Sequence, residues 1–192
     1  KIKFIMLSTR QVYLPRINIT EASKIAPMNV YARNCLNSEK FCKEKLKNNL
    51  LVLRLSNVVG AEQGKKKKPS FMSMIIKGLK NKKIIIDNNY NLYKDFIPIK
   101  LLCLYIEKLI EKKIFGIVNV GTGIPILVRD FLKDIINFKK IKFVFKMDNT
   151  FNDNNFSFNI KKLHHITGLK IKIKALKLYH HDLKVMINKI ND

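Results

Sequence analysis

The sequence predicts an α/β fold with a mainly parallel sheet. Short apolar runs alternate along the chain with longer segments whose apolar residues recur at helical spacing. Two of these runs end in the small polar or glycine residues that follow a strand, at Ser56 and at Gly121. Strands that alternate with helices form βαβ units, and such units place their strands parallel to one another.

The predicted strands are short and apolar. Residues 2–7 form a buried strand, and residues 50–55 form a largely apolar one that ends at Ser56 and Asn57. Residues 84–86 and 96–99 flank a polar loop rich in Asn. In chain order, the strands are expected at 2–7, 50–55, 84–86, 96–99, 117–120 and 142–146.

The predicted helices follow from apolar residues that fall on one side of a helical wheel. The first begins near residue 29 and places Tyr31, Cys35 and Cys42 near one face, and a later one, at 101–112, gathers Leu, Ile and Tyr on one side. Loops are expected at 60–69 and 148–155. The helices are expected at about 29–48, 71–79, 101–112, 127–137 and 176–190.

The chain is strongly basic, with a formal net charge of +24 over 192 residues. This charge is compatible with a polyanionic partner, either nucleic acid or a membrane surface. It is equally compatible with a codon bias, because Lys greatly outnumbers Arg, and Arg is the residue that reads base edges. We favour the codon bias and expect no specific nucleic-acid partner. No apolar run is long enough to cross a bilayer.

The cysteines and histidines predict neither disulfides nor a metal site. The three Cys residues show no CxxC spacing, which is typical of reduced thiols and a cytoplasmic protein. The histidines occur as two adjacent pairs, 164–165 and 180–181, without a nearby Cys or carboxylate cluster. Neighbouring helical residues point in different directions, so we expect solvated histidines and no metal.

Five segments resemble the motifs of a known family. Taken in order, they resemble the extended short-chain dehydrogenase/reductases, the NAD-dependent epimerases and dehydratases that act on nucleotide sugars. The resemblance covers nearly the whole chain but only the later three-fifths of a typical member. The segments are LSTRQVY at 7–13 (S-[ST]-x-x-V-Y), Pro27 and Tyr31 (the approach to Y-x-x-x-K), RLSNVVG at 54–60 (R-x-x-N-x-x-G), KDFI at 94–97 (R-D-[FY]-[IV]) and NVGTG at 119–123 (N-[VL]-G-[ST]-G).

The resemblance implies a fold and a set of roles. The fold would be the later part of a Rossmann-like parallel sheet plus a small C-terminal substrate-binding portion, to which residues 60–192 contribute. Residues 1–192 would then be one partial domain without the Gly-rich dinucleotide-binding half. The catalytic positions would be Thr9 and Tyr31, and the cofactor, NAD or NADP, would contact Tyr31, Leu55 and Ser56. The nucleotide-sugar substrate would contact Asn57 and Lys94.

Cys35 departs from the family pattern at the most consequential position. A Tyr side chain titrates at about 10, so a phenol needs a nearby cation to act as a base at neutral pH. The resemblance places a Lys one helical turn after Tyr31, where this chain has Cys35. A thiol is neutral at pH 7, and a thiolate would raise the pKa of the phenol. Lys94 is a second departure, because it stands where the family has an Arg.

The only glycine turn that follows a predicted strand is at residues 121–123. It has the form GxG but lacks a third Gly, and Pro125 interrupts the start of the following helix. A lone GxG is weak evidence for a dinucleotide site, so we interpret this turn as a structural connection. The cradle for a cofactor's pyrophosphate is therefore not expected in this chain.

Two functional hypotheses follow, together with a weaker third. The first is an NAD(P)-dependent epimerase, dehydratase or reductase of nucleotide-activated sugars, an oxidoreductase, isomerase or lyase whose catalysis by this chain alone is left open. Such a chain would be a fragment, a split-gene product or a decayed copy, and its partner would be a separate N-terminal half or a second copy in a homodimer. The alternative is a non-catalytic module that binds nucleotide sugars or a partner. A basic nucleic-acid-binding protein ranks last.

Overall fold

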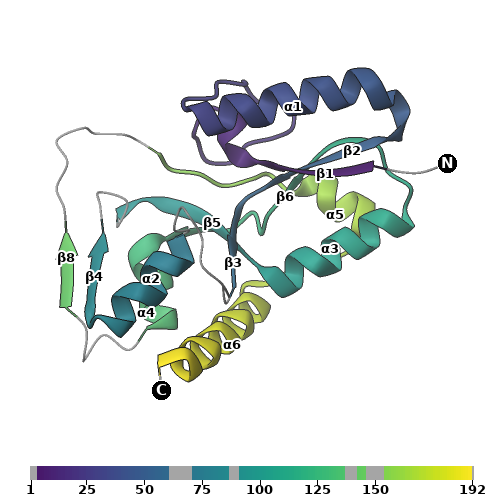
Figure 1. Cartoon of the computed structure of the whole chain (residues 1–192). Coiled ribbons are helices and arrows are strands. Elements are labelled where there is room, and N and C mark those ends of the chain that lie inside the picture. Colours follow the sequence, from purple (N-terminus) through teal and green to yellow (C-terminus); the bar gives the residue numbers. More distant parts are fainter. Residues whose placement is uncertain (1–3, 61–70, 87–90, 137–141, 146–153, 192) are drawn as a thin grey trace.

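Three parallel strands form the central sheet of the molecule (Figure 1). The strands are β1 (Phe4–Thr9), β2 (Leu50–Leu55) and β6 (Gly116–Val120), in the order β1-β2-β6. In register, Thr9 lies beside Leu55, and Leu55 lies beside Val120, so the three carboxyl ends meet at one edge. The computed structural model describes residues 4–60, 71–86, 91–136, 142–145 and 154–191.

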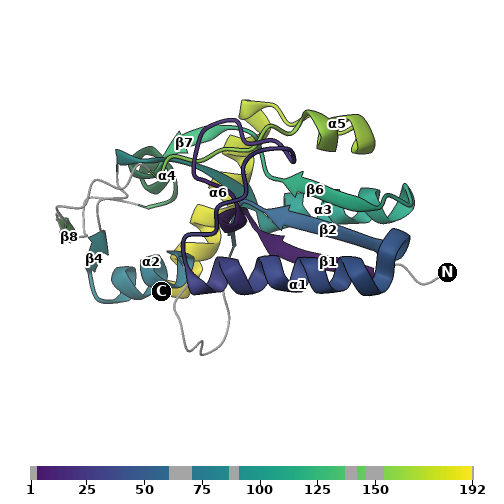
Figure 2. The same ribbon diagram turned by 90° about the horizontal axis from the view of Figure 1, so that it is seen from above.

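Helices cover both faces of this sheet (Figures 1 and 2). Helix α1 (Val30–Leu46) lies on one face, and α3 (Ile99–Glu111) and α5 (Lys161–Thr167) lie on the other. Burial on both faces explains why β2 is apolar along almost its whole length. Helix α1 begins where the Asn29 side chain accepts a hydrogen bond from the amide of Ala32 at 2.8 Å, as an N-cap residue does.

A second lobe is built around another three-stranded sheet, ordered β3-β5-β7. Strands β3 (Asn57–Val59) and β5 (Tyr93–Pro98) are parallel, whereas β7 (Pro125–Leu127) is antiparallel to β5. Only Ser56 separates β2 from β3, so the chain passes directly from the central sheet into this lobe. A two-stranded parallel sheet, β4 (Lys83–Ile86) with β8 (Lys142–Phe145), lies at the far side of the lobe.

Three helices and an aromatic cluster form the core of the second lobe. The helices are α2 (Phe71–Lys80), α4 (Val128–Ile135) and α6 (Ile173–Asn191). The rings of Phe96 and Phe131 are stacked with centroids 4.1 Å apart and an interplanar angle of 15°. Aromatic pairs of this kind contribute stability beyond the area that they bury. The lobe is therefore held by its own core, next to that of the central sheet.

The structure confirms the predicted fold class and shows what the local patterns missed. Every predicted strand and helix has a counterpart, with boundaries that differ by a few residues. Strands β3 and β7 and helix α5 were not predicted, because three-residue strands are defined by pairing with β5 and α5 has only seven residues. The prediction of solvated histidines is wrong for His180, which is 3% exposed. Most of the loops predicted at 60–69 and 148–155 lie outside the described residues.

Strand β1 lies at an edge of the central sheet. It pairs with β2 on one side, and no described strand pairs with its other side. Phe4 and Leu7 on this strand are 47% and 57% exposed, which is unusual for large apolar residues of a parallel sheet. An edge of this kind is a template for pairing with a further strand.

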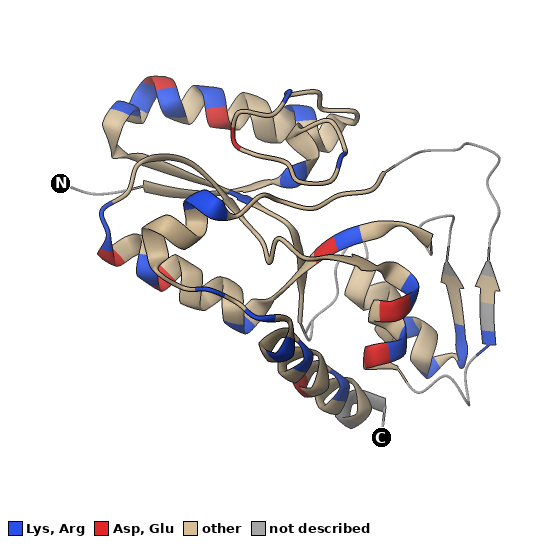
Figure 3. Cartoon of the chain, turned by 180° about the vertical axis from the view of Figure 1, so that it is seen from behind, with Lys and Arg blue, Asp and Glu red and all other residues tan. Residues whose placement is uncertain are grey.

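The positive charge is spread over the surface rather than concentrated on one element. Figure 3 shows Lys and Arg residues on several helices, with Asp and Glu residues among them. The run of Lys at 65–68 lies outside the described residues. Within the described part of the chain, no helix combines the length and apolarity that a membrane span requires.

Candidate active site

The carboxyl ends of β1 and β2 bring several predicted site residues to one edge of the sheet. Thr9 is the last residue of β1, and Leu55, its register partner, is the last of β2. The amide of Ser56 donates to the carbonyl of Val120 at 2.9 Å, which extends the pairing with β6 by one residue. Ligands of open α/β sheets bind beyond the carboxyl ends of the strands, which makes this edge the candidate site.

Thr9, Tyr31 and Cys35 lie together at this edge. Burial of the phenol raises the pKa of Tyr31, and the nearby Cys35 thiol raises it further, whereas the nearby Thr9 hydroxyl lowers it. The net direction is upward, so the phenol of Tyr31 resists ionisation. The Tyr31 side chain is nevertheless 59% exposed and open to a ligand, whereas Thr9 is 8% exposed. The structure thus brings together the two predicted catalytic residues and Cys35, the residue that stands in place of the family's Lys.

Ser56 and Asn57 continue the site beyond β2. The Ser56 hydroxyl is buried, and it has no hydrogen-bond partner among the described residues. Asn57 is engaged on both sides of its amide: Oδ1 accepts from Arg10 Nε, and Nδ2 donates to the carbonyl of Asp95, both at 3.1 Å. The Ser56 hydroxyl is therefore unsatisfied, while Asn57 links Arg10, the residue after β1, to Asp95 of β5.

Lys94 is buried, with 6% of its surface exposed. Its ammonium group donates to the backbone carbonyl of Asn154. The amide of Phe156 donates in turn to the carbonyl of Tyr93, so the chain from Asn154 onward runs along β5. Lys94 thus holds the backbone at Asn154 against β5.

A buried polar network behind the site was not predicted. Glu39 on α1 accepts from the Ser8 hydroxyl and forms an ion pair with Arg54 of β2, with an Nη2 to Oε2 distance of 2.5 Å. The Arg54 guanidinium also lies over the Tyr13 ring at 4.7 Å, and the Tyr13 hydroxyl donates to Asn119 at 2.9 Å. The signal that could have revealed the network is Arg54 itself, a charge inside an apolar strand, which requires a buried partner.

The glycine turn at 121–123 is occupied by a carboxylate. Asp95 is fully buried and accepts from the Thr122 amide at 2.9 Å, the Thr122 hydroxyl at 2.7 Å and the Gly123 amide at 3.0 Å. The amide of Phe158 completes the set at 3.3 Å. The interpretation of this turn as structural is thus supported, because these two turn amides already have an anionic partner.

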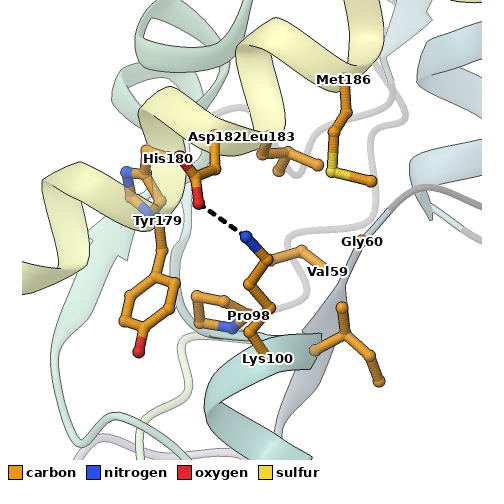
Figure 4. A pocket seen from close by; sticks show the side chains of 10 residues that line it. Val59, Gly60, Pro98, Lys100, Tyr179, His180, Asp182, Leu183 and Met186 are labelled. Atoms are coloured by element: carbon orange, nitrogen blue, oxygen red, sulfur yellow. Dashed lines mark hydrogen bonds and ion pairs between the residues drawn. The ribbon is translucent and has the colours of Figure 1, made fainter.

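A cavity of about 60 Å³ lies between α6 and the ends of β3 and β5 (Figure 4). Lys100 and Asp182 form an exposed ion pair across it at 2.8 Å. His180, which also lines it, has its Nδ1 atom 3.3 Å from Asp134, and its Nε2 atom is buried without a partner among the described residues. Burial lowers the pKa of His180, and Asp134 opposes this only in part. None of the predicted catalytic residues lines this cavity.

The chain belongs to the NAD dependent epimerase/dehydratase family, whose model matches residues 1–121. Similar solved structures include UDP-glucuronic acid 4-epimerase from Bacillus cereus in complex with NAD, with a TM-score of 0.80, 19% identity, and coverage of 99% of this chain and 62% of that one. UDP-N-acetylglucosamine 4-epimerase from Methanobrevibacter ruminantium, in complex with UDP-N-acetylmuramic acid, has a TM-score of 0.79, 18% identity, and coverage of 97% and 62%.

RMD from Pseudomonas aeruginosa, complexed with NADPH, is also similar, with a TM-score of 0.77, 17% identity, and coverage of 98% of this chain and 66% of that one. At these identities the likeness establishes the fold. The chain spans slightly less than two thirds of the length of these solved structures. A search of curated proteins gave no match.

The described residues match a dinucleotide cofactor only in part. Thr9 and Ser56 offer hydroxyl groups at the ends of β1 and β2, Tyr31 offers one from the first turn of α1, and the buried Ser56 hydroxyl has no partner of its own among the described residues. The described residues offer no glycine-rich turn between a strand and a helix N-terminus, the usual cradle for a pyrophosphate. Among the described residues, the fit to a cofactor is therefore limited to these hydroxyl groups and does not extend to its pyrophosphate.

Proposed function

We propose that this chain is the substrate-side part of an NAD(P)-dependent enzyme that epimerises, dehydrates or reduces a nucleotide-activated sugar. The observation that carries the proposal is the proximity of Thr9, Tyr31 and Cys35 at the carboxyl edge of the sheet, where Thr9 and Cys35 both act on the pKa of the Tyr31 phenol. Membership of the epimerase/dehydratase family supports it. The free thiols of Cys35, Cys42 and Cys103 suit a cytoplasmic protein.

Tyr31 is proposed to exchange a proton with a sugar hydroxyl, and Thr9 to hold that hydroxyl in place. A nicotinamide cofactor, when bound, would accept and return the hydride. Proton transfer by a positioned side chain typically contributes about a hundred- to ten-thousand-fold to the rate. Because burial and Cys35 raise the pKa of Tyr31, we expect proton transfer to be slow at neutral pH and faster at alkaline pH.

The substrate contacts are proposed to come from β3 and β5. Asn57 and Lys94 are the residues proposed to contact the nucleotide sugar; Asn57 begins β3 directly after Ser56, and Lys94 lies on β5. Their present hydrogen bonds suggest that they act mainly by shaping the wall of the candidate site. The ammonium group of Lys94 would also add positive charge near a diphosphate.

A Gly-rich dinucleotide-binding half is the proposed partner. The exposed apolar residues Phe4 and Leu7 and the open side of β1 support a further parallel strand at this edge. A homodimer is the second possible assembly. We expect the 192-residue chain alone to aggregate and to bind no NAD(H) at sub-millimolar concentration, as measured by calorimetry. Low-micromolar affinity without a partner would contradict this.

The test is to co-express the chain with the Gly-rich half of a related epimerase and to measure hydride transfer by NADH absorbance with a UDP-sugar. We expect activity that rises with pH and is abolished by Tyr31→Phe. Tyr93→Phe is the matched control, because Tyr93 is also exposed, at 43%, but lies on β5. A complex that binds both NAD and the UDP-sugar but transfers no hydride even at alkaline pH would refute catalysis.

That last outcome would favour the alternative, a non-catalytic module that binds nucleotide sugars. The specific observation in its favour is Cys35, which adds no cation beside Tyr31 and raises the pKa of the phenol. Such a module would bind a UDP-sugar equally well with Tyr31 or with Phe at this position. Calorimetry of the two forms therefore separates the hypotheses.

A further inference from the structure

Arg10 is a partly buried cation next to the candidate catalytic pair. It directly follows Thr9, its Nε atom donates to Asn57, and its guanidinium lies 4.5 Å from the centroid of the Phe156 ring. Within the part of the chain that the structure describes, neither of its Nη atoms has a hydrogen-bond partner. Burial lowers the pKa of Arg10 to about 10, although the charge of Asp95 opposes this shift.

Asp95 does not neutralise Arg10 by direct contact. Its carboxylate oxygens accept four hydrogen bonds from Thr122, Gly123 and Phe158, and none from Arg10. A partly buried cation loses some of its hydration, and no described residue supplies a bound anion in exchange. A purely structural role of Arg10 would explain the hydrogen bond from its Nε atom to Asn57. It would not explain why neither Nη atom has a partner among the described residues.

Arg10 lines a pocket of about 140 Å³. On its rim, Asn29 donates to Gln11 at 2.8 Å and also caps α1, so these two amide oxygens are already used. Asn154 also lines the pocket, and its buried Oδ1 atom has no hydrogen-bond partner among the described residues. The pocket therefore offers a two-pronged cationic donor and one free acceptor.

We propose that this pocket binds an anionic group of the substrate, a carboxylate or a phosphate, through Arg10, while a neighbouring hydroxyl donates to Asn154. A planar guanidinium matches two oxygens of either anion. Whole-ligand sites usually measure about 300–1,000 Å³, so a pocket of about 140 Å³ holds one polar part of a larger ligand. This inference rests on the proposed function. It adds that the substrate carries an anionic group close to the sugar hydroxyl that Thr9 and Tyr31 would contact.

The anion has two possible sources, the carboxylate of a sugar acid and the phosphate of the nucleotide. Their shared chemistry is tested on the isotope-labelled full chain by NMR titration with sodium glucuronate, inorganic phosphate and neutral glucose. We expect at least one anion to bind saturably and glucose to bind at least about tenfold more weakly, since hydrogen bonds to charged groups are strong. Glucuronate binding identifies the carboxylate, and binding of phosphate alone identifies the nucleotide.

Two variants and one control make the assignment specific. Arg10→Gln removes the cation, and Asn154→Asp places a negative charge opposite the bound anion without touching the Arg10 contacts with Asn57 and Phe156. Each should weaken anion binding by about tenfold or more. Arg33→Gln removes the same charge from the exposed surface of α1 and should leave binding unchanged. Undiminished anion binding in both site variants, or glucose binding as tight as glucuronate, would overturn the inference.

The test of anion binding and the test of the proposed enzymatic function can fail independently of each other. Anion binding needs neither cofactor nor turnover, so a chain that binds glucuronate through Arg10 but never transfers hydride refutes the enzymatic proposal alone. Conversely, hydride transfer from a UDP-sugar, together with undiminished glucuronate and phosphate binding in both site variants, refutes the anion pocket alone.

Discussion

Asp95 accepts hydrogen bonds from both the amide and the hydroxyl of Thr122, at 2.9 and 2.7 Å. Thr122 follows β6 of the central sheet, whereas Asp95 lies on β5 of the second lobe. This carboxylate therefore joins the two sheets at the point where the chain crosses between them. The relationship also gives the GxG sequence a structural role, because the anion that this turn binds is the carboxylate of Asp95.

The substitution Asp95→Asn is expected to lower the free energy of unfolding by about 3 kcal/mol. An amide presents one acceptor and one donor, so at least one donor of Thr122 or Gly123 loses its acceptor in a fully buried site. Urea denaturation measures the change. Asp130→Asn on the exposed surface of α4 is the control and should change stability by less than about 0.5 kcal/mol. A similar effect of both substitutions would show that the hydrogen bonds of Asp95 are not stabilising.

The substitution Gly121→Ala is expected to be destabilising by about 1–3 kcal/mol, through overpacking. A Cβ atom at this position would lie 2.6 Å from Asp95 Oδ2 and 3.0 Å from the Phe158 ring, and Asp95 cannot yield without losing its hydrogen bonds. Gly168→Ala tests the opposite case, because Gly168 has a φ of +69° but open space around it. It should cost only about 1 kcal/mol of backbone strain. Equal thermal shifts for the two variants would contradict the steric explanation.

The central fold could be predicted from the sequence because its signals are local. The apolar run of β2 and the helical pattern after Asn29 are short-range features, and the Thr9 and Tyr31 positions follow from motifs within them. Pairings between distant residues gave no comparable signal. Thr122 is 27 positions from Asp95, and the three-residue strands β3 and β7 exist only because β5 pairs with them. Burial of His180 likewise depends on how α6 packs against α4.

Removal of one partner of the buried pair between Glu39 and Arg54 is expected to cost about 3–5 kcal/mol. In Glu39→Gln, the guanidinium of Arg54 stays buried, at 3% exposure, without its counter-charge. Glu44→Gln, at an exposed position of the same helix, should have little effect and serves as the control. Both are compared by urea denaturation. A loss below about 1 kcal/mol for Glu39→Gln would mean that Arg54 finds another partner or water.

His180 is expected to make the protein less stable as the pH falls. Its pKa is lowered from 6.5, mainly by burial, so the unfolded chain binds the proton more readily than the folded one. The stabilising contribution is therefore present above about pH 6.5 and is lost progressively below it. In His180→Asn, the melting temperature should fall less between neutral pH and pH 5 than in the parent chain. His181→Asn, at an exposed neighbouring position, should retain the parent pH dependence, and a flattened profile in this control would contradict the assignment.

The substitution Cys35→Lys is expected to lower the pKa of Tyr31. It removes a thiol that raises this pKa and places a cation one helical turn from the phenol. In the complex with a dinucleotide-binding half, hydride transfer at neutral pH should increase, by up to about a hundred- to ten-thousand-fold if the general base had been fully suppressed. The measurements are the NMR titration of the Tyr31 ring and the pH dependence of NADH formation, whose alkaline rise should move to lower pH.

Two variants decide whether the gain comes from the phenol. Cys42→Lys introduces the same charge farther along α1 and should leave both the Tyr31 titration and the rate unchanged, since exposed charges are screened over about 10 Å. Tyr31→Phe should abolish the gain in the Cys35→Lys background. A rate increase that survives Tyr31→Phe would assign proton transfer to another group. A lower pKa of Tyr31 without any rate increase would mean that the phenol does not limit hydride transfer and that the defect lies elsewhere in the site.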